Sequence, residues 1–154
     1  RDVFADDEPV NDIYELTAGS AYLTIILCSN LIKYINEKGA YVVTKGIMED
    51  FLRTRAFGAS TFLTEEYFEP QLLERGHDEL KAVNRSILTQ IARLSKSMGY
   101  AHVNDIHYES YELSSIQELI QRLCDRDVLV KDGRDRYKIK VKIFERWLLF
   151  QDGE

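Results

Sequence analysis

Residues 128–143 read VLVKDGRDRYKIKVKI, in which Asp132-Gly133 separates two apolar runs. Asp and Gly both tolerate the positive φ that a tight turn between antiparallel strands requires, so this stretch predicts a β-hairpin. The second strand is expected over Arg136 to Ile143, where apolar residues alternate with cations and the two kinds fall on opposite faces. The cations of this strand are Arg136, Lys138, Lys140 and Lys142.

Helical patterns surround the hairpin. Leu80 to Met98 has apolar residues three or four apart, the strongest helical signal of the chain. Ser115-Ile116-Gln117-Glu118 matches the capping box and predicts a helix that begins at Ser115. Residues 99–113 suit either a short helix or an extended segment, and we favour a short helix near His102 to His107. A closing helix is expected over Phe144 to Phe150. Helix, short helix, capped helix and hairpin, in this order, predict a winged helix-turn-helix domain whose wing is the hairpin.

The first half of the chain is predicted to be all-helical. A short helix after Pro9 ends at Gly19, and Ser20 caps a second helix that ends at Lys38-Gly39. The first turns of this second helix are apolar nearly all round, which predicts a position buried among other helices. Two more helices are expected, one from Thr44 to Phe57-Gly58 and one from Thr61 to Leu73 with a restart or a kink at Pro70.

Charge suggests where the chain divides. The 154 residues are 45% hydrophobic and 30% charged, a globular composition with a net charge of -6. Residues 1–79 hold 7 Lys and Arg against 15 Asp and Glu, whereas residues 80–154 hold 13 against 11. The change falls at the polar stretch Gly76 to Glu79, so we expect a helical segment over 1–76 and a winged-helix domain over 77–154. The fold class is therefore mainly α.

Two features bear on the compartment. The chain has only 2 Cys, both in apolar patterns, which favours a reducing, cytoplasmic location over a disulfide framework. The most apolar run, Ala21 to Cys28, is far shorter than the ~20 residues that span a bilayer, so no membrane partner is expected. Because the first residue is Arg1 and not Met, we suspect a piece of a longer protein.

Two stretches resemble a known family. One is Ile13 to Leu23, IYELTAGSAYL, with the following apolar helix and Tyr34-Ile35-Asn36. The other is Tyr137-Lys138-Ile139, followed by Val141, Ile143-Phe144 and Trp147-Leu148. They resemble the C-terminal region of P-loop ATPases of the AAA+ and STAND type, in which a helical lid precedes a winged helix.

The resemblance implies a lid-like role for residues 1–76 and an ATPase core before Arg1 that binds ATP and Mg²⁺. It also implies that Gly19, Ser20 and Ala21 lie close to the nucleotide, although Ala21 stands where the family lid usually has Pro. The missing core, and other copies of the same protein, are the implied partners.

Within the chain itself the sequence offers little catalytic chemistry. A P-loop, with Gly, four residues, Gly, Lys and Ser or Thr, is absent from the 154 residues, so we expect no enzyme activity and no bound cofactor in this piece. His102, His107 and Cys124 lack the spacing of a zinc site, and Cys28 and Cys124 are expected in the core. The carboxylates of Glu65, Glu66 and Glu69 are expected to form a solvated face.

Nucleic-acid contact is the remaining binding hypothesis. The solvent face of the helix from Ser115 is expected to carry Gln117, Glu118, Gln121, Arg122 and Asp125, which attracts phosphate poorly. Gln117 and Gln121 would either read adenine edges or merely keep the helix soluble. The wing cations, extended by Lys131 and Arg134, would either contact DNA phosphates or guard an exposed sheet edge against pairing.

A second set of residues is also open to two interpretations. Four aromatic residues would either pack in the core or form a docking patch for the ATPase core or another subunit: Tyr108, Tyr111, Trp147 and Phe150. The resulting hypothesis is a non-enzymatic lid and winged-helix region of a P-loop ATPase, which serves regulation and partner interaction and contacts DNA through its wing. The alternative is a free-standing winged-helix transcription regulator whose acidic helical half dimerises.

Overall fold

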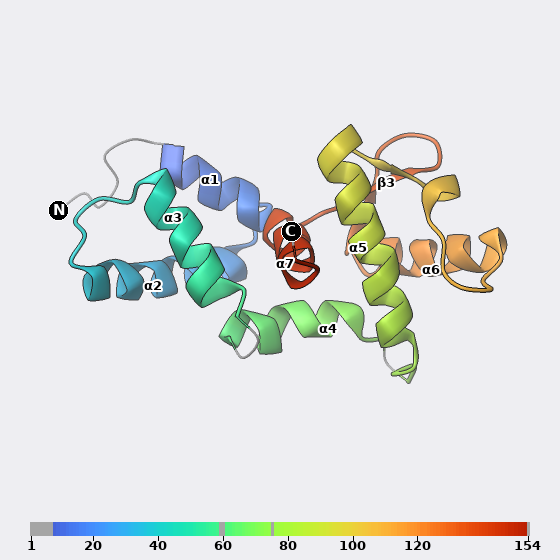
Figure 1. Ribbon diagram of the computed structural model, residues 1–154, viewed down its shortest axis with the longest axis horizontal. Coiled ribbons are helices and arrows are strands. Elements are labelled where there is room, and N and C mark those ends of the chain that lie inside the picture. The colour runs from blue at the N-terminus through green and yellow to red at the C-terminus, as the bar shows by residue number, and fades with distance from the viewer. Residues whose placement is uncertain (1–7, 59–60, 75, 154) are drawn as a thin grey trace. The chain divides into compact units, whose positions relative to one another are not determined.

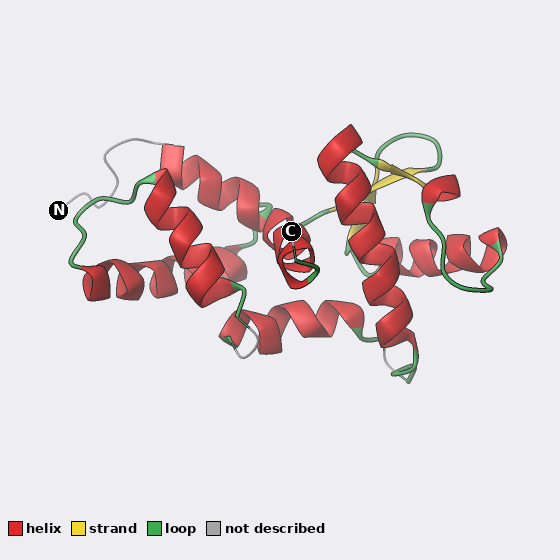
Figure 2. Ribbon diagram, viewed as in Figure 1, coloured by secondary structure: helices red, strands yellow, loops and turns green. Residues whose placement is uncertain are grey.

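The computed structural model describes residues 8–58, 61–74 and 76–153, and it is mainly helical with one small antiparallel sheet (Figures 1 and 2). The chain forms two compact units, Arg1–Glu65 and Glu66–Glu154. This division lies earlier than the boundary expected at residue 76. Residues 66–74 pack with the second unit because Glu69 forms ion pairs with Lys81 and Arg85, and because the Asn84 side chain donates to the Leu72 carbonyl.

The first unit contains the helices α1 (Glu8–Thr17), α2 (Ala21–Lys38) and α3 (Lys45–Phe51), and the π-helical turn η1 (Leu52–Ala56) follows α3 directly. A second π-helical turn, η2 (Thr64–Phe68), spans the division between the units. The predicted caps are confirmed: Ser20 Oγ accepts from the Leu23 N–H at 3.4 Å, and Thr44 Oγ1 accepts from the Ile47 N–H at 3.3 Å.

The burial of α2 differs from the prediction. Leu23, Leu27 and Leu31 point into the core of the unit, but Ile25 is 69% exposed and Ile32 is 50% exposed. The expectation of a helix buried on all sides is therefore wrong. Within this unit α2 contacts α1 and α3, which cover only part of its circumference.

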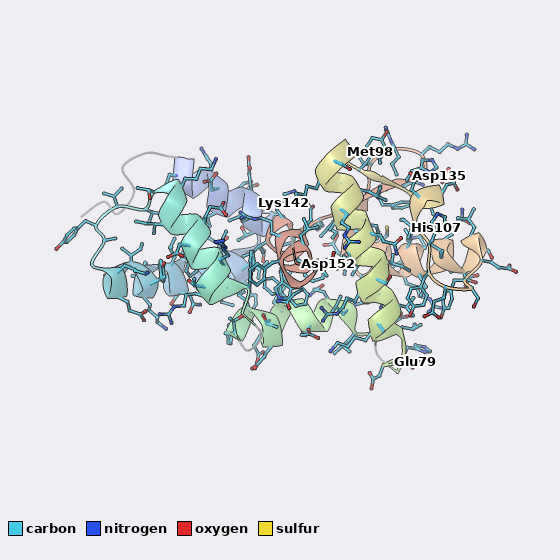
Figure 3. All side chains as sticks on the ribbon, in the orientation of Figure 1. Glu79, Met98, His107, Asp135, Lys142 and Asp152 are labelled. Atoms are coloured by element: carbon cyan, nitrogen blue, oxygen red, sulfur yellow. The ribbon has the colours of Figure 1, made fainter. Side chains whose placement is uncertain are left out.

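The second unit is built around α5 (Leu80–Met98), with α4 (Glu69–Leu72), α6 (Leu113–Asp125) and α7 (Lys142–Gln151). Figure 3 labels Glu79 and Met98 at opposite ends of α5 and Lys142 at the start of α7. The core includes three nearly parallel rings, those of Phe68, Phe144 and Trp147. Their centroids lie 5.1 to 6.1 Å apart, and all three side chains are buried.

The sheet contains β1 (Ala101–His102), β2 (Leu129–Lys131) and β3 (Arg136–Ile139) in the order β1-β3-β2. The predicted hairpin is confirmed, since β2 and β3 pair antiparallel and Gly133 takes a φ of +100° in their turn. The second strand is shorter than expected. It ends at Ile139, because Val141 already serves as the N-cap of α7.

The segment before α6 is extended at its start, where a short helix was expected. Ala101 and His102 pair with Tyr137 and Arg136, and only Val103–Asp105 forms a turn of 3₁₀-helix. The pairing partners lie more than thirty residues away in sequence, so local periodicity does not report them. The short helix predicted near His102 to His107 is therefore confirmed only for Val103–Asp105.

The start of α6 also corrects a prediction. The helix begins at Leu113 with Glu112 as its N-cap, and the Ile116 N–H already donates to the Glu112 carbonyl at 3.1 Å. Ser115 thus lies inside the first turn, exposed to solvent, and does not cap the helix. The capping-box match at Ser115 was wrong because the helical hydrogen bonds begin three residues earlier, at a residue without a side-chain cap.

Candidate functional site

The cations of the wing do not form one ridge. Arg136 and Lys138 lie on β3, whereas Lys140 follows the strand and Lys142 is the first residue of α7. Regular alternation along one strand, which the sequence suggested, stops at Ile139. The four side chains therefore do not share one strand face at regular spacing.

The three lysines Lys138, Lys140 and Lys142 each lie close to a carboxylate. Lys140 forms an ion pair with Asp127, and Lys142 lies 2.5 Å from the buried Glu145 carboxylate. The Lys138 ammonium lies 3.7 Å from Asp132. Because these carboxylates already balance the ammonium groups, the cations attract phosphate less than their number suggests.

The two arginines of the wing differ in their contacts and in the exposure of their side chains. Arg136 donates through Nε to the Asp132 carbonyl at 2.8 Å, and its guanidinium lies 4.6 Å from the centre of the Tyr100 ring. Arg134, at the hairpin turn, has a side chain that is 97% exposed and lies 3.7 Å from Asp135. Arg134 is therefore the wing cation best placed to meet a partner.

The edge-guard interpretation does not apply to the cations of β3. This strand is the middle one of the sheet, paired with β1 through Arg136 and Tyr137 and with β2 through Tyr137, Lys138 and Ile139. Charged residues guard strands whose backbone groups are unpaired. Among the wing cations, Lys131 alone lies on an edge strand of this sheet, β2.

The exposed face of α6 is as poor in positive charge as the sequence indicated. Gln121 donates to the Asp125 carboxylate at 2.8 Å, and Arg122 lies 3.5 Å from Glu74. From residue 97 to residue 121 the chain has no Lys or Arg, but it has Asp105, Glu109, Glu112 and Glu118. This end of the second unit would therefore repel phosphate.

Two of the four aromatic residues lie partly exposed beside this acidic stretch. Tyr108 and Tyr111 meet edge to face, with ring centroids 5.3 Å apart and an interplanar angle of 85°. Tyr111 is 38% exposed, and the neighbouring Leu113 is 45% exposed. Trp147 is buried in the core, whereas Phe150 is 36% exposed. The core interpretation therefore holds for Trp147, and the surface interpretation is open for the others.

The turn between α1 and α2 holds the three residues that the resemblance placed near a nucleotide. Gly19 has a φ of +72°, and a Cβ there would come within 3.1 Å of the Tyr14 ring. The Ser20 hydroxyl serves as the cap of α2, and Ala21 is the first residue of that helix. Local structure thus accounts for Gly19 and Ser20 without a ligand.

The remaining candidates show no assembled chemistry. Cys28 and Cys124 are half-buried, and burial raises the pKa of both thiols, so neither is an activated nucleophile. The backbone of His107 bonds to both ends of the Gln90 amide group, at 2.7 and 3.0 Å. In the part of the chain that the structure describes, no group of three or more His, Cys, Asp or Glu residues could hold a metal ion.

Glu69 departs from the expected solvated face, while Glu65 and Glu66 are exposed. Its carboxylate lies 2.5 Å from Lys81 Nζ and 2.7 Å from Arg85 Nη2. Burial raises the pKa of Glu69, but the hydrogen bonds and charges of these two cations outweigh it and leave the pKa below its ordinary value. Glu69 therefore fastens η2 and α4 to α5, a role that spacing alone did not reveal.

Comparisons with known proteins add no relative: no protein-family model, no curated protein and no solved structure matches this chain. Over the described residues, the structure contains no helix that combines the length and apolar character needed to cross a membrane.

Proposed function

We propose that this chain is the non-enzymatic C-terminal part of a P-loop ATPase of the AAA+ or STAND type, with a helical lid-like unit and a winged-helix unit. The observation that carries the proposal is the order of elements in the second unit. Helix α5, strand β1, helix α6 and the hairpin β2-β3 follow one another, and the sheet has the order β1-β3-β2. A winged helix combines a helix-turn-helix with such a hairpin.

Partner proteins fit this unit better than DNA does. The side of α6 that would enter a groove carries acidic residues and no cation before Arg122, and Lys138, Lys140 and Lys142 of the wing lie beside carboxylates. The partly exposed Tyr108, Tyr111 and Leu113 beside Glu109 and Glu112 resemble the composition of a protein interface, in which aromatic residues are enriched. We therefore assign the second unit to contact with the ATPase core or another protein subunit, with DNA contact restricted to the wing tip.

The sequence that precedes Arg1 in the gene tests the proposal. A P-loop upstream supports it, whereas a start codon directly before Arg1 overturns it and favours the free-standing regulator. A second measurement uses the purified chain: phosphate release from ATP with Mg²⁺ should stay at the level of a protein-free control, because the chain has no P-loop. Steady turnover by the chain alone would contradict the non-enzymatic assignment.

A further inference from the structure

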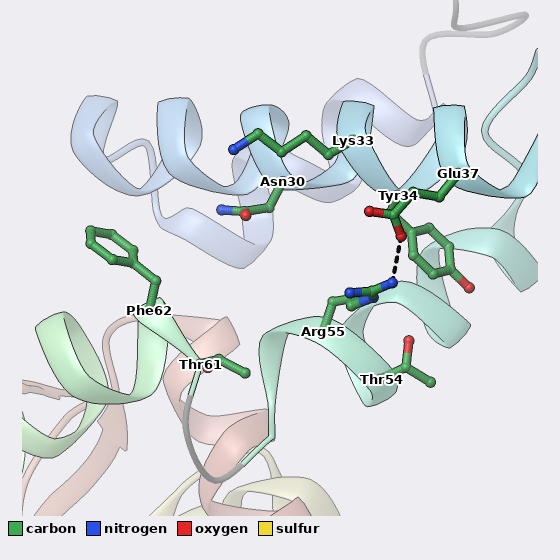
Figure 4. Close-up of a pocket in the computed structure, with 8 residues that line it drawn as sticks. All are labelled: Asn30, Lys33, Tyr34, Glu37, Thr54, Arg55, Thr61 and Phe62. Carbon is green, nitrogen blue, oxygen red and sulfur yellow. Dashed lines mark hydrogen bonds and ion pairs between the residues drawn. The ribbon is translucent and has the colours of Figure 1, made fainter.

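The first unit contains a hollow that none of the functions considered so far uses. It has a volume of about 320 Å³ and lies between α2 and the π-helical turn η1, with the start of the next helix at its rim. Figure 4 shows Phe62 at one end of the hollow and the Arg55–Glu37 ion pair at the other. Small-molecule sites commonly measure about 300–1,000 Å³, so the hollow suits a small ligand.

Two cations and one carboxylate line this hollow. Arg55 forms an ion pair with Glu37, whereas the Lys33 ammonium group forms no ion pair or hydrogen bond with any residue that the structure describes. The net charge of the lining is therefore positive, although residues 8–65 as a whole carry more Asp and Glu than Lys and Arg. An anionic ligand would be attracted by Lys33 and would compete with Glu37 for the guanidinium group.

The guanidinium of Arg55 is held in place before any ligand arrives. It lies 6.0 Å from the centre of the Tyr34 ring, and the Tyr34 hydroxyl in turn donates to the Asp50 carboxylate. A guanidinium carries five N–H donors in a fixed plane, and only one of its nitrogens faces Glu37. A ligand that displaces Glu37 could therefore face two of these donors with the paired oxygens of a carboxylate or a phosphate, where Glu37 uses one nitrogen.

The backbone that carries Arg55 is unusual. Residues 52–56 form a π-helical turn, in which the Phe57 N–H donates to the Leu52 carbonyl at 2.9 Å, although the sequence there has no Gly or Pro. The turn buries Leu52 and Ala56 and leaves Thr54 and Arg55 facing the hollow. Single π-helical turns are uncommon and occur often at functional sites.

The rest of the lining offers polar acceptors and one aromatic face. The Asn30 amide nitrogen donates to the Ile26 carbonyl at 2.9 Å, which leaves the amide oxygen to accept a hydrogen bond. The Phe62 side chain is 52% exposed, a large apolar surface at the edge of a charged hollow. A ligand with a flat apolar group would cover it.

We propose that this hollow binds a small organic anion, a carboxylate or a phosphate monoester that carries a flat apolar group. The anionic oxygens take the place of Glu37 on Arg55, Lys33 adds a second positive charge, and the flat group lies against Phe62. This site belongs to one unit only and is separate from the Gly19–Ala21 turn. It does not depend on the ATPase assignment of the preceding subsection.

Isothermal titration of the purified 154-residue chain with three probes tests the proposal: phenyl phosphate, benzoate and the neutral benzyl alcohol. One of the two anions should bind saturably with a Kd below about 1 mM, and it should bind at least about 5-fold more tightly than benzyl alcohol. The anion that binds more tightly identifies the head group. Equal binding of all three probes, or no saturation by either anion at about 10 mM, would overturn the proposal.

Substitutions locate the binding. Arg55→Gln and Lys33→Gln should each weaken the binding of the preferred anion by about 3- to 10-fold. Glu37→Gln should tighten this binding, because the anion then no longer competes with a carboxylate for Arg55. Lys45→Gln, which removes one exposed positive charge of the same unit outside the hollow, is the matched control and should change the Kd less than about 2-fold. If the control weakens binding as much as Arg55→Gln does, the attraction comes from the general charge of the unit and the hollow is not the site.

Phe62→Ala separates the two parts of the ligand. It should weaken phenyl phosphate or benzoate by about 3-fold or more and leave the binding of inorganic phosphate unchanged. An equal loss for inorganic phosphate would contradict the stacking of the flat group on Phe62. Circular-dichroism spectra that match the unchanged chain show that each variant remains folded.

Discussion

The longest helices of the two units bury their side chains in different ways. In the second unit α5 has 19 residues and a single buried stripe that includes Val83, Ile87 and Ile91. In the first unit α2 has 18 residues and buries Leu23 and Leu27, yet its equally apolar Ile25 faces solvent. A helix with a polar face reveals which side meets the core, whereas a helix that is apolar all round takes its orientation from its neighbours.

The aromatic residues of the two units divide between the core and the surface. The second unit gathers Phe68, Phe144 and Trp147 into one buried stack. In the first unit Tyr14 is 67% exposed, Tyr22 is 52% exposed and Phe62 is 52% exposed. Each unit therefore has rings of both kinds, since Phe51 of the first unit is buried and Tyr111 of the second unit is 38% exposed. The buried rings stabilise their unit, and the exposed rings are available for contact.

The largest expected effect compares one ring of each kind. Phe68→Ala removes a fully buried ring from the stack and should lower the free energy of unfolding by about 3–5 kcal/mol. Phe62→Ala should lower it by less than about 1 kcal/mol, since half of that side chain is already in water. Denaturant unfolding followed by tryptophan fluorescence measures the effect of Phe68→Ala, because the single Trp of the chain lies in the same stack. Far-UV circular dichroism, to which the helices of the first unit contribute, measures the effect of Phe62→Ala. Similar losses for the two variants would mean that the exposed Phe62 ring contributes as much to stability as the buried Phe68 ring.

The next effect compares two helix starts. Thr44 accepts a hydrogen bond from the Ile47 N–H, so Thr44→Ala should destabilise the first unit by about 1 kcal/mol. Ser115 is an exposed residue inside the first turn of α6, so Ser115→Ala should leave the second unit unchanged or stabilise it by a few tenths of a kcal/mol, about the difference in helix propensity. Urea midpoints of the two variants measure the difference. A loss of about 1 kcal/mol for Ser115→Ala would restore Ser115 as a cap.

The helix starts also show what the sequence could and could not predict about the fold. The hairpin, the long helix α5 and the caps at Ser20 and Thr44 were predictable because each depends on neighbours within a few residues. Strand β1 was not, since its two residues pair with Tyr137 and Arg136 far along the chain. The start of α6 was missed because Glu112 provides no side-chain cap, so the residues around Ser115 matched a motif that the helix does not use.

The candidate sites were less predictable than the fold. The wing cations were visible as residue types, but Asp127, the partner of Lys140, comes from the segment before β2. Glu145, the partner of Lys142, lies on the same helix α7, which the sequence pattern had assigned to the second strand up to Ile143. The hollow of the first unit is lined by residues of α2 and by Arg55. Arg55 lies on a π-helical turn, which the residue types of that segment do not predict. A pattern in one segment does not report which side chain from another segment neutralises or completes it.

A smaller effect tests how η2 and α4 are attached within the second unit. Glu69→Gln weakens two ion pairs, with Lys81 and Arg85, and should cost about 1 kcal/mol at pH 7 because the cations are partly exposed. The pKa of Glu69 is lower in the folded chain than in the unfolded chain, so the carboxylate stabilises the fold above its unfolded pKa of about 4.3. The stabilisation disappears as the pH falls through the lowered folded pKa.

The unfolding free energies of the unchanged chain and of Glu69→Gln, measured from pH 7 down to pH 3, should therefore converge at the acidic end. Glu66→Gln is the matched control, since Glu66 is an exposed carboxylate of the same unit. A difference between Glu69→Gln and the unchanged chain that stays constant over this range would show that the lost stability is not electrostatic.

The smallest effect concerns DNA and the balanced charges of the wing. Four phosphate contacts would give a slope near -3.6 in a plot of log affinity against log salt, at about -0.9 for each contact. Because Lys140 and Lys142 are paired with carboxylates and Arg134 is the most exposed wing cation, we expect weak binding of duplex DNA with a slope of about -1 to -2.

Asp127→Asn frees Lys140 and should tighten DNA binding by a few-fold and steepen the slope by up to about 1. Gln117→Ala, on the exposed face of α6, should change neither quantity. Fluorescence anisotropy with a duplex across a salt series measures both. A slope of -3.6 or steeper for the unchanged chain would mean that the wing lysines exchange their carboxylate partners for DNA phosphates. The second unit would then be a nucleic-acid-binding unit.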